Sequence, residues 1–514
     1  MMTGEPSPGR DGLNGARKPA SVLVPTCVAL LMAFVRCANV AEAQVVEGGR
    51  QARGKVATAG ARERNANRAF PIKVDANRMA RMKKDVAYVM SISEKQLRAM
   101  VPRQSGIYFT DCPNCGGGAQ DRANWKWLPQ HPRQLTCRDC GEVYPDNPKY
   151  PDNEFIEIAA PTAGHRYHYY ERKDGYRIFF RAAADYLAKE YLAARCRDLA
   201  QLYAVTGDEV YARRASLILV RFAEVYPTWA YKFDYPFREK KFSPHSQNRI
   251  PGLTTPYRAS RWSWWAYMGI STPLLAAYES LKPWPGLAGM DGGRAQAKIE
   301  QDLFAAMVEF VMGFRETYSN MSPGTWCSYI HAGHVLDRPD WVLEAARRTA
   351  TFMEQTFLYD GFWHESAPSY CAQVLGSMRD VAAAMQGYTP SRGTAPAVAA
   401  ELSASLDKTR SGIRALEKAL AGTHMPHGGF VTINDTWGKH KNRSIPCPAT
   451  ESHLLPSLGL AVLGGGTGKQ QLYTWLDYTA GGGHQHHSVL NMSLFAHGNE
   501  LLRDIGYTHT AWRS

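Results

Sequence analysis

The sequence has little of what marks several protein classes. Apart from one apolar run near its start, no stretch approaches the ~18 uninterrupted apolar residues of a membrane-spanning helix. No block of lysine and arginine is long enough to single out nucleic acid as a partner. The sequence has 514 residues, of which 45% are hydrophobic and 21% charged. This composition excludes a disordered chain, a collagen-like fibre and a small disulfide scaffold.

The sequence does carry an excess of positive charge and many aromatic side chains. Lysine and arginine number 60 against 47 aspartate and glutamate, a formal net charge of +13. Such a charge favours an acidic partner, which could be nucleic acid, anionic lipid or an acidic polysaccharide. The 13 Trp, 26 Tyr and 18 Phe suit the stacking of sugar rings. Composition leaves these partners open, with an acidic polysaccharide suited at least as well as nucleic acid; nothing in the sequence indicates the oligomeric state.

The first 43 residues have the pattern of a secretory signal peptide. Arg17 and Lys18 precede an apolar run over 21–35, and Ala41-Glu42-Ala43 offers a cleavage site with small residues. The run is short for a membrane span, although an uncleaved anchor is the alternative. We expect the mature protein to be exported, to the periplasm or the medium, with no stable membrane span after cleavage.

Four of the ten cysteines are arranged like metal ligands. Cys112-Pro-Asn-Cys115-Gly and Cys137-Arg-Asp-Cys140-Gly form two CxxC-Gly knuckles, a zinc-ribbon pattern in which each turn directs two thiolates to one point. A structural zinc is predicted, and a pair of disulfides is the alternative in an oxidising compartment. Four thiolates leave no open coordination position, which argues against a catalytic zinc.

The chain divides into segments of different character. Residues 44–75 resemble a flexible linker, and 76–160 contain the zinc-ribbon-like motif. In 161–425 helical periodicity dominates, and Gly207-Asp208 marks the turn of a hairpin that ends at Pro227. Further amphipathic stretches cover 262–282, 296–318, 340–358, 370–388 and 395–421. Serial hairpins of this kind predict a bundle, a solenoid or a closed α/α toroid.

The C-terminal segment, 426–514, has the signs of β-structure. Leu490, Met492 and Leu494 alternate with polar residues, and His497-Gly498-Asn499 reads as a turn into a second strand over 500–505. Two or three hairpins cannot close a sandwich, so we expect this segment to be the start of an antiparallel β-sandwich domain that is truncated at residue 514. The predicted fold is a multidomain α+β protein.

Three polar clusters are candidates for the active site. The first places Asn320 before a helix, where it could equally be a helix cap. The second is Asp360-Gly-Phe-Trp-His-Glu365-Ser-Ala-Pro-Ser-Tyr370, a loop that leads into a helix, where Tyr370 could also be a core residue. The third is the Gly481–Ser488 stretch, in which His484 and His486 share one face of an extended chain and suit a metal site or catalysis.

Together these clusters resemble the heparinase II/III-like polysaccharide lyases, which include heparin, heparan and some alginate lyases. The resemblance covers roughly residues 170–514. Its most specific parts are the Asp360–Tyr370 run and the stretch from His484 to Leu502-Arg-Asp504-Ile-Gly-Tyr507. It implies an α/α toroid followed by an antiparallel β-sandwich domain, and bacterial members carry a zinc-ribbon-like segment upstream.

The resemblance also implies roles that suit the chemistry of a lyase. Cleavage of a uronate 4-linkage needs a group that neutralises the carboxylate, a base for the C5 proton and an acid for the leaving oxygen. Asn320 matches the neutralising residue, and Tyr370 matches the tyrosine that protonates the leaving oxygen and can itself be the base. His484 matches the histidine that acts as the base on the other epimer.

A second zinc site is implied in the β-domain. His486 and Asp504 match two ligands of a structural zinc, and the third, a histidine, lies downstream in the family. Because this chain stops at Ser514, we expect either a fragment or an incomplete site.

Other residues are candidates for substrate binding. Arg261 with Trp264 and Trp265 could stack a sugar and pair with its acid groups, although the aromatic residues could equally pack in the core. Glu365 and His331 are assigned to substrate binding as well. The stretch 427–437, which contains Asn434-Asp435, is either a substrate contact at the domain junction or a packed turn.

Three functions compete at this point. The leading hypothesis, which the resemblance implies, is an exported lyase for an acidic polysaccharide, with no nucleic-acid partner. The alternatives are a non-catalytic glycan-binding protein that keeps a degenerate lyase fold, and a glycoside hydrolase. A hydrolase needs two carboxylates beside the cleft, and Glu365 has no convincing partner in the sequence.

Overall fold

The computed structural model describes residues 68–108, 110–117, 124–158, 165–233, 241–243, 259–263, 266–313, 316–389, 395–437, 451–467, 470–479, 484–486 and 490–507. All of them belong to one compact unit, Glu42–Ser514. The predicted signal peptide, most of the predicted linker, and Trp264 and Trp265 lie outside the described residues. Among the helices that are described, none has the length and apolarity needed to cross a membrane.

Two helices and two small sheets open the described chain. The helices α3 (Ala76–Ser91) and α4 (Glu94–Met100) begin at Asp75 and Ser93, whose side chains accept hydrogen bonds from the first turn. The first sheet has the order β1-β2-β3 and the second β4-β5-β6, both antiparallel. Their strands are β1 (Trp125–Lys126), β2 (Leu135–Cys137), β3 (Val143–Tyr144), β4 (Glu154–Ile158), β5 (His165–Glu171) and β6 (Arg177–Ile178).

The four cysteines of the CxxC-Gly knuckles gather at the first of these sheets. Their sulfur atoms all lie within 4.8 Å of one another, and two of the pairs are 3.6 Å apart. A zinc ion with four sulfurs at ~2.3 Å would place them about 3.8 Å apart, whereas a disulfide needs ~2.05 Å. The cluster is therefore compatible with a structural zinc site.

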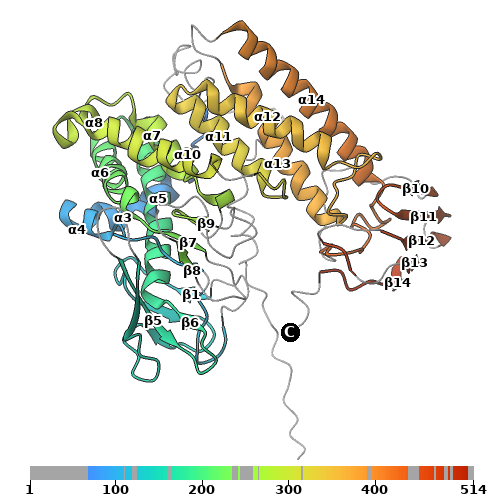
Figure 1. Cartoon of the computed structure of the whole chain (residues 1–514), viewed down its shortest axis with the longest axis horizontal. Helices are drawn as coiled ribbons and strands as arrows, with labels where there is room; N and C mark the ends of the chain where they lie inside the picture. Colours follow the sequence, from blue (N-terminus) through green and yellow to red (C-terminus); the bar gives the residue numbers. More distant parts are fainter. Residues whose placement is uncertain are drawn as a thin grey trace, which may run out of the picture. The chain divides into compact units, whose positions relative to one another are not determined.

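The middle of the chain is helical and built from packed pairs (Figure 1). The hairpin predicted around Gly207-Asp208 is confirmed: Gly207 ends α5 (Phe180–Thr206) with a φ of 75°, Asp208 caps α6 (Glu209–Val225), and Pro227 follows. The later helices are α7 (Thr272–Leu281), α8 (Pro285–Gly289), α9 (Ala295–Lys298), α10 (Ala306–Met312), α11 (Ser322–Leu336), α12 (Pro339–Gln355), α13 (Pro368–Gly387) and α14 (Pro396–Ala421), with a π-helical segment over Ile299–Ala305.

These helices pack in sequence-local groups. The long helix α5 contacts α3, α6 and α7, whereas α11 contacts α12 and α13, and α14 contacts α12 and α13. A three-stranded sheet of order β8-β7-β9 lies between α6 and α7 in the sequence, formed by β7 (Tyr231–Phe233), β8 (Lys241–Ser243) and β9 (Ala259–Ser260). The fold is thus mixed helix and sheet, as expected, and its closure into a toroid stays a prediction.

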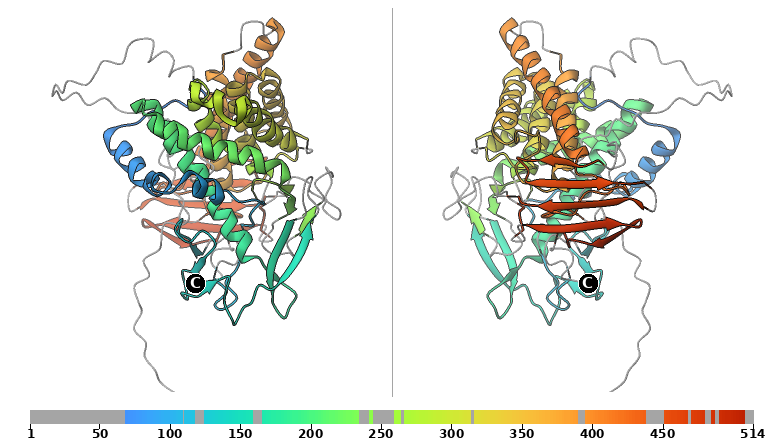
Figure 2. Two further views of the ribbon diagram at one scale, coloured as in Figure 1. Left: turned by 90° about the vertical axis from the view of Figure 1, so that its left-hand side faces the viewer. Right: turned by 90° about the vertical axis from the view of Figure 1, so that its right-hand side faces the viewer.

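A five-stranded antiparallel meander follows the helices, as Figure 2 shows. Its strands are β10 (His453–Leu455), β11 (Leu460–Gly465), β12 (Leu472–Asp477), β13 (Asn491–Ala496) and β14 (Asn499–Leu502). The hairpin predicted at His497-Gly498 is confirmed, with a φ of 52° and 79° at these two residues. The sandwich stays a prediction, because the described residues after α14 contain this one sheet.

Polar contacts attach this sheet to the helical part. Asp360, in the loop before α13, accepts hydrogen bonds from the backbone N–H groups of Ser457 and Leu458 at 3.0 and 2.9 Å. The Tyr473 hydroxyl donates to the His424 carbonyl at 3.0 Å. Because the Asp360 contacts join the loop before α13 to the sheet, they help to place the start of α13 beside the segments that follow the helices.

Candidate active site

Three segments that are far apart in the sequence meet at the start of α13. The Asn434 side chain donates to the Ser366 carbonyl at 2.9 Å, and the Ser369 hydroxyl donates to the Asp435 carbonyl at 3.3 Å. The Asp435 N–H donates to the His484 carbonyl at 3.0 Å, and the His486 N–H donates to the Asn434 side chain at 3.1 Å. This network of backbone and side-chain hydrogen bonds brings residues 366–369, the segment 434–437 and the segment 484–486 together.

Tyr370 and His484 face each other at this junction. Tyr370 lies in the first turn of α13, which begins at Pro368, where the fixed φ of proline suits a helix start. The Tyr370 and His484 rings are stacked, with centroids 3.7 Å apart and planes at 22°. The Tyr507 ring lies 6.2 Å from that of Tyr370. Tyr370 and His484 are both partly exposed, so the pair is accessible to a ligand.

His484 is held between two carboxylates. Its Nδ1 is 2.9 Å from Asp435 Oδ2, and its Nε2 forms an ion pair of 3.3 Å with Glu365 Oε2. A neutral imidazole has one N–H and one acceptor nitrogen, so only the imidazolium presents an N–H to both carboxylates. The contact with Asp435 is a hydrogen bond, whereas Glu365 Oε2 lies at ion-pair distance without a hydrogen bond. Burial alone would lower the pKa of His484, but Asp435 and Glu365 outweigh it and raise the pKa to about 9. The residue therefore carries a positive charge at neutral pH.

The Tyr370 phenol is protonated at neutral pH. Burial raises its pKa above the ordinary value of 10, and Tyr507, Asp435 and Glu365 raise it further. A phenol in this state can donate a proton or a hydrogen bond. It becomes a base only when a ligand or a change of surroundings stabilises the phenolate.

Asn320 lies beside the same face of α13. Its side-chain amide donates to Gln373 Oε1 at 2.8 Å, and Gln373 follows Tyr370 by one helical turn. The loop before Asn320 is organised by Glu316, which accepts hydrogen bonds from the Ser322 hydroxyl at 2.8 Å and the Trp326 indole at 3.0 Å. All three residues to which the family resemblance gives catalytic roles thus lie at or next to the start of α13.

His486 and Asp504, the two predicted ligands of a second zinc, approach each other through His486 Nδ1. Asp504 Oδ1 is 3.7 Å from His486 Nδ1, whereas Nε2 is bonded to Asp435 Oδ1 at 3.0 Å. Asp504 also accepts hydrogen bonds from Asn491 and from the Gly506 N–H. Within the described ranges, the only group of three or more possible ligands is that of the four cysteines. The second zinc site stays a prediction.

The other predicted substrate-binding residues do not join the cluster through their described contacts. Arg261 is only 6% exposed and lies over the rings of Tyr226 and Phe310, at 5.7 and 5.9 Å. The His331 ring packs on Phe70 with centroids 4.7 Å apart, and burial lowers its pKa to about 4. Both environments suit packing better than the capture of a charged sugar. Glu365, in contrast, belongs to the cluster through His484.

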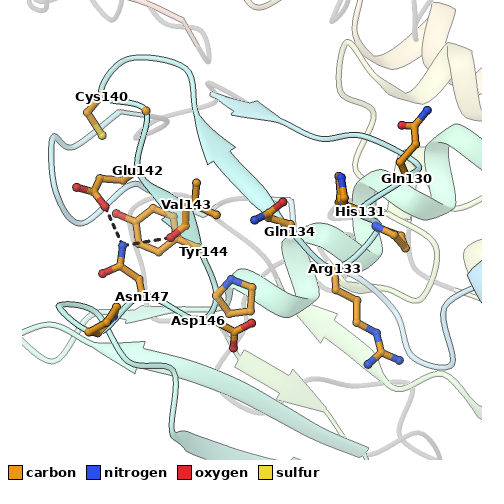
Figure 3. Close-up of a pocket in the computed structure, with 14 residues that line it drawn as sticks. Gln130, His131, Arg133, Gln134, Cys140, Glu142, Val143, Tyr144, Asp146 and Asn147 are labelled. Carbon is orange, nitrogen blue, oxygen red and sulfur yellow. Dashed lines mark hydrogen bonds between the residues drawn. The ribbon is translucent and has the colours of Figure 1, made fainter.

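A cavity of about 840 Å³ lies in a different region, beside the four-cysteine cluster (Figure 3). It is lined by residues 130–134 and 140–148, including Gln130, Arg133 and Asp146, whose side chains are drawn there. None of the predicted catalytic residues lines it. The candidate active site is therefore defined by its polar contacts and not by this cavity.

The similarity to known proteins is structural. No family model matches this chain, and no curated protein matches it. Among solved structures, heparan sulfate lyase HepC from Pedobacter heparinus is 14% identical, with a TM-score of 0.43, over 63% of this chain and 49% of that chain. The structural neighbours are heparan sulfate lyases and heparinase III. A heparinase III structure is 14% identical, with a TM-score of 0.41, over 62% of this chain and 51% of that chain.

A mutant of HepC is 13% identical, with a TM-score of 0.44, over 84% of this chain and 62% of that chain. This chain thus spans about half the length of the first two of these structures. Because the identities and TM-scores are low, the functional argument rests on the geometry around Tyr370 and His484.

The sequence did not indicate that Tyr507 and Gln373 belong to the cluster, and it left the role of Asp435 undecided. Asp435 stood in a segment that could be a substrate contact or a packed turn, and it proves to bond both His484 and His486. The position of Tyr507 next to Tyr370 was not expected. Gln373 could have been found, because residues three apart share one side of a helix.

Proposed function

We propose that this chain is a polysaccharide lyase that cleaves a uronate-containing acidic polysaccharide by β-elimination. The observation that carries the proposal is the stacked pair of Tyr370 and His484, with Asp435 and Glu365 on the two ring nitrogens of His484. The motif resemblance of these residues supports it. The formal net charge of +13 suits an acidic polymer.

The reaction sets three tasks. The C5–H bond breaks, its electron pair forms the C4=C5 double bond, and the bond from C4 to the leaving oxygen breaks. The carboxylate beside C5 must be hydrogen-bonded or neutralised, because the C5 proton is otherwise too weakly acidic. A base accepts the C5 proton, and an acid protonates the leaving oxygen.

The residues at the start of α13 suit these tasks. Tyr370, which holds its proton at neutral pH, gives that proton to the leaving oxygen. Asn320, beside Gln373, donates a hydrogen bond to the carboxylate. His484 first loses the proton that it carries at neutral pH, and the uncharged ring then accepts the C5 proton. Activity should therefore depend on the pKa of His484. Asp435 and Glu365 position the ring and set that pKa.

An absorbance assay tests the proposal. A lyase creates an unsaturated uronate that absorbs in the near ultraviolet, and heparan sulfate, alginate and chondroitin sulfate form a suitable panel. Tyr370→Phe keeps the ring but removes the proton, so turnover should fall roughly 10²- to 10⁴-fold while the protein stays folded and still binds the polymer. Tyr359→Phe is the matched control, because Tyr359 is fully exposed in the loop before α13.

A hydrolase or a glycan-binding protein would give a different result in this assay. New reducing ends without ultraviolet absorbance would indicate a hydrolase, and binding without either product would indicate a glycan-binding protein. Turnover of Tyr370→Phe within about threefold of the wild type would remove Tyr370 from the mechanism, since the loss of an acid/base group costs far more.

We also propose a structural zinc ion on Cys112, Cys115, Cys137 and Cys140. Four free thiols at tetrahedral spacing support it, and the ion would stabilise the fold around β1–β3 without taking part in the reaction. The division into a signal peptide (1–43), a ribbon-containing region (76–160), a catalytic toroid (161–425) and the start of a sandwich (426–514) is part of the same proposal, as is export.

A further inference from the structure

A cavity of about 330 Å³ is lined by charged residues of α3 and α5, two helices that pack on each other. None of its lining residues belongs to the cluster around Tyr370 and His484. The helix α3 also precedes residues 170–514, the range of the family resemblance, so the resemblance gives it no role. The lining residues, which we call the arginine cavity, are Arg78, Arg81, Met82, Asp85, Arg195, Arg197 and Asp198.

The spacing of the α3 residues places them on one side of the helix. They are three or four positions apart, the separation at which side chains of a helix are neighbours. Two polar contacts hold this side against α5. Arg78 Nη2 donates a hydrogen bond to Gln201 Oε1 at 3.0 Å, and Arg195 Nη2 lies 3.8 Å from Asp85 Oδ2. The arginine side chains of both helices are therefore gathered around one hollow.

A buried carboxylate fixes two of these arginines. The Asp198 side chain is 5% exposed, and its oxygens accept hydrogen bonds from Arg195 at 3.1 and 2.6 Å and from Arg197 at 3.2 and 3.0 Å. These bonds use the acceptor sites of the carboxylate, whereas each guanidinium has more N–H groups than Asp198 takes. Because the two guanidinium groups are held in place, a ligand does not have to order them.

The arginine cavity has more positive than negative charge. Four arginines and two aspartates give a formal charge of 4 − 2 = +2. Arg81 is exposed, and it makes no hydrogen bond or ion pair with the residues that the structure describes. A cluster that only joined two helices would not need this excess. Cations gathered around a hollow attract an anion.

We propose that the arginine cavity binds the acid groups of an acidic polysaccharide, as a second binding site outside the active site. Guanidinium groups form paired hydrogen bonds with the oxygens of anions such as carboxylates and phosphates, and a sulfate ester offers its oxygens in the same way. Asp85, whose side chain is 51% exposed, can accept a hydrogen bond from a neighbouring sugar hydroxyl. The choice of a polysaccharide rests on the proposed lyase function.

Two other occupants suit the cavity less well. Single-stranded nucleic acid stacks its bases on aromatic side chains, and the arginine cavity contains none. The chain's own segment 44–67 is basic, so it would add positive charge instead of neutralising it. It contains five basic residues against two acidic ones: Arg50, Arg53, Lys55, Arg62 and Arg64 against Glu47 and Glu63.

Direct binding by the full chain tests the proposal without any need for turnover. The probe is dextran sulfate, which carries sulfate esters but no uronate and so cannot be a substrate of the proposed lyase. Arg81→Gln/Arg197→Gln should weaken its binding at least ~10-fold, because charge-assisted hydrogen bonds are lost. Lys83→Gln/Lys84→Gln is the matched control, since it removes the same charge from exposed positions of α3 that do not line the cavity. This control should bind within about twofold of the wild type.

Three further polymers identify the bound group. Alginate carries carboxylates alone, neutral dextran carries no charge, and single-stranded DNA carries phosphates. An arginine-dependent affinity for alginate as well as dextran sulfate supports a general oxyanion site, and one for dextran sulfate alone supports a sulfate site. No binding by the wild type, equal losses in the control, or tighter arginine-dependent binding of the DNA would each overturn the proposal.

A single variant keeps the proposal testable if the double variant does not fold. Arg81→Gln removes a side chain with no described partner, so the thermal melt should be unchanged while binding of dextran sulfate falls severalfold. Failure of the lyase proposal gives a different result. A chain without lyase activity whose binding depends on the two arginines leaves this site standing, whereas a chain that cleaves uronate polymers but binds dextran sulfate equally well without them overturns this inference alone.

Discussion

The charge of His484 leads to the sharpest prediction. Glu365→Gln removes one of the two carboxylates beside the imidazole but keeps the size of the side chain and an acceptor oxygen. With Glu365 and Asp435 in place the pKa of His484 is about 9. With Asp435 alone we expect it to fall by on the order of one unit toward the ordinary value of ~6.5.

The size of the effect follows from the fraction of uncharged histidine. Two units below the pKa, at pH 7, about 1% of the wild-type histidines are uncharged, against about 10% in the variant. If the uncharged ring is the base, kcat/KM should rise with pH, with a midpoint near 9 in the wild type and near 8 in Glu365→Gln. At pH 7 the variant should be faster by up to about tenfold.

A kcat/KM that falls with rising pH would give His484 a different role. If the imidazolium neutralises the substrate carboxylate, kcat/KM should fall above the same midpoint, and the variant should lose activity at lower pH. Glu401→Gln is the control, because Glu401 pairs with Arg347 on the exposed surface, and it should leave the profile unchanged. A profile that is flat from pH 7 to 10, or a midpoint that Glu365→Gln does not move, would refute the reasoning about His484.

Stability gives a readout that needs no substrate. The pKa of His484 is higher in the folded chain than in the unfolded chain, so its contribution to the unfolding free energy is complete below pH ~6.5 and is lost as the pH rises through about 9. Denaturant titrations should show this loss in the wild type. The loss should be smaller, and should end at lower pH, in Glu365→Gln.

Two further predictions concern the ribbon and the attachment of the sheet. Cys112→Ser should lose one equivalent of zinc by metal analysis and loosen the region around β1–β3 while lyase activity persists; unchanged metal content, or a disulfide detected by mass spectrometry, would contradict the zinc assignment. Asp360→Ala removes the carboxylate that accepts the N–H groups of Ser457 and Leu458, so the unfolding free energy should fall by ~2 kcal/mol. A denaturation midpoint like that of the wild type would show that these bonds contribute little.

Local signals in the sequence were sufficient for several elements. The Gly207-Asp208 hairpin and the turn at His497-Gly498 depend on residues that tolerate a positive φ or cap a helix, and neighbours in the chain decide both. The two CxxC-Gly knuckles predicted a four-sulfur cluster because each local turn directs its two thiolates to one point. The helix α11 was recognised only at its start, since its burial on most sides leaves little periodic contrast.

The sequence by itself determined the chemical groups of the site: a tyrosine before a helix, an asparagine before another, and a histidine after a run of glycines. Only the tertiary structure decided which of them meet. Asp435 and His484 are 49 residues apart, and their contact depends on the packing of two loops against α13. That contact, with Glu365 on the other ring nitrogen, sets the charge of His484, and no local pattern encodes it because a pKa depends on every charge that folding brings close.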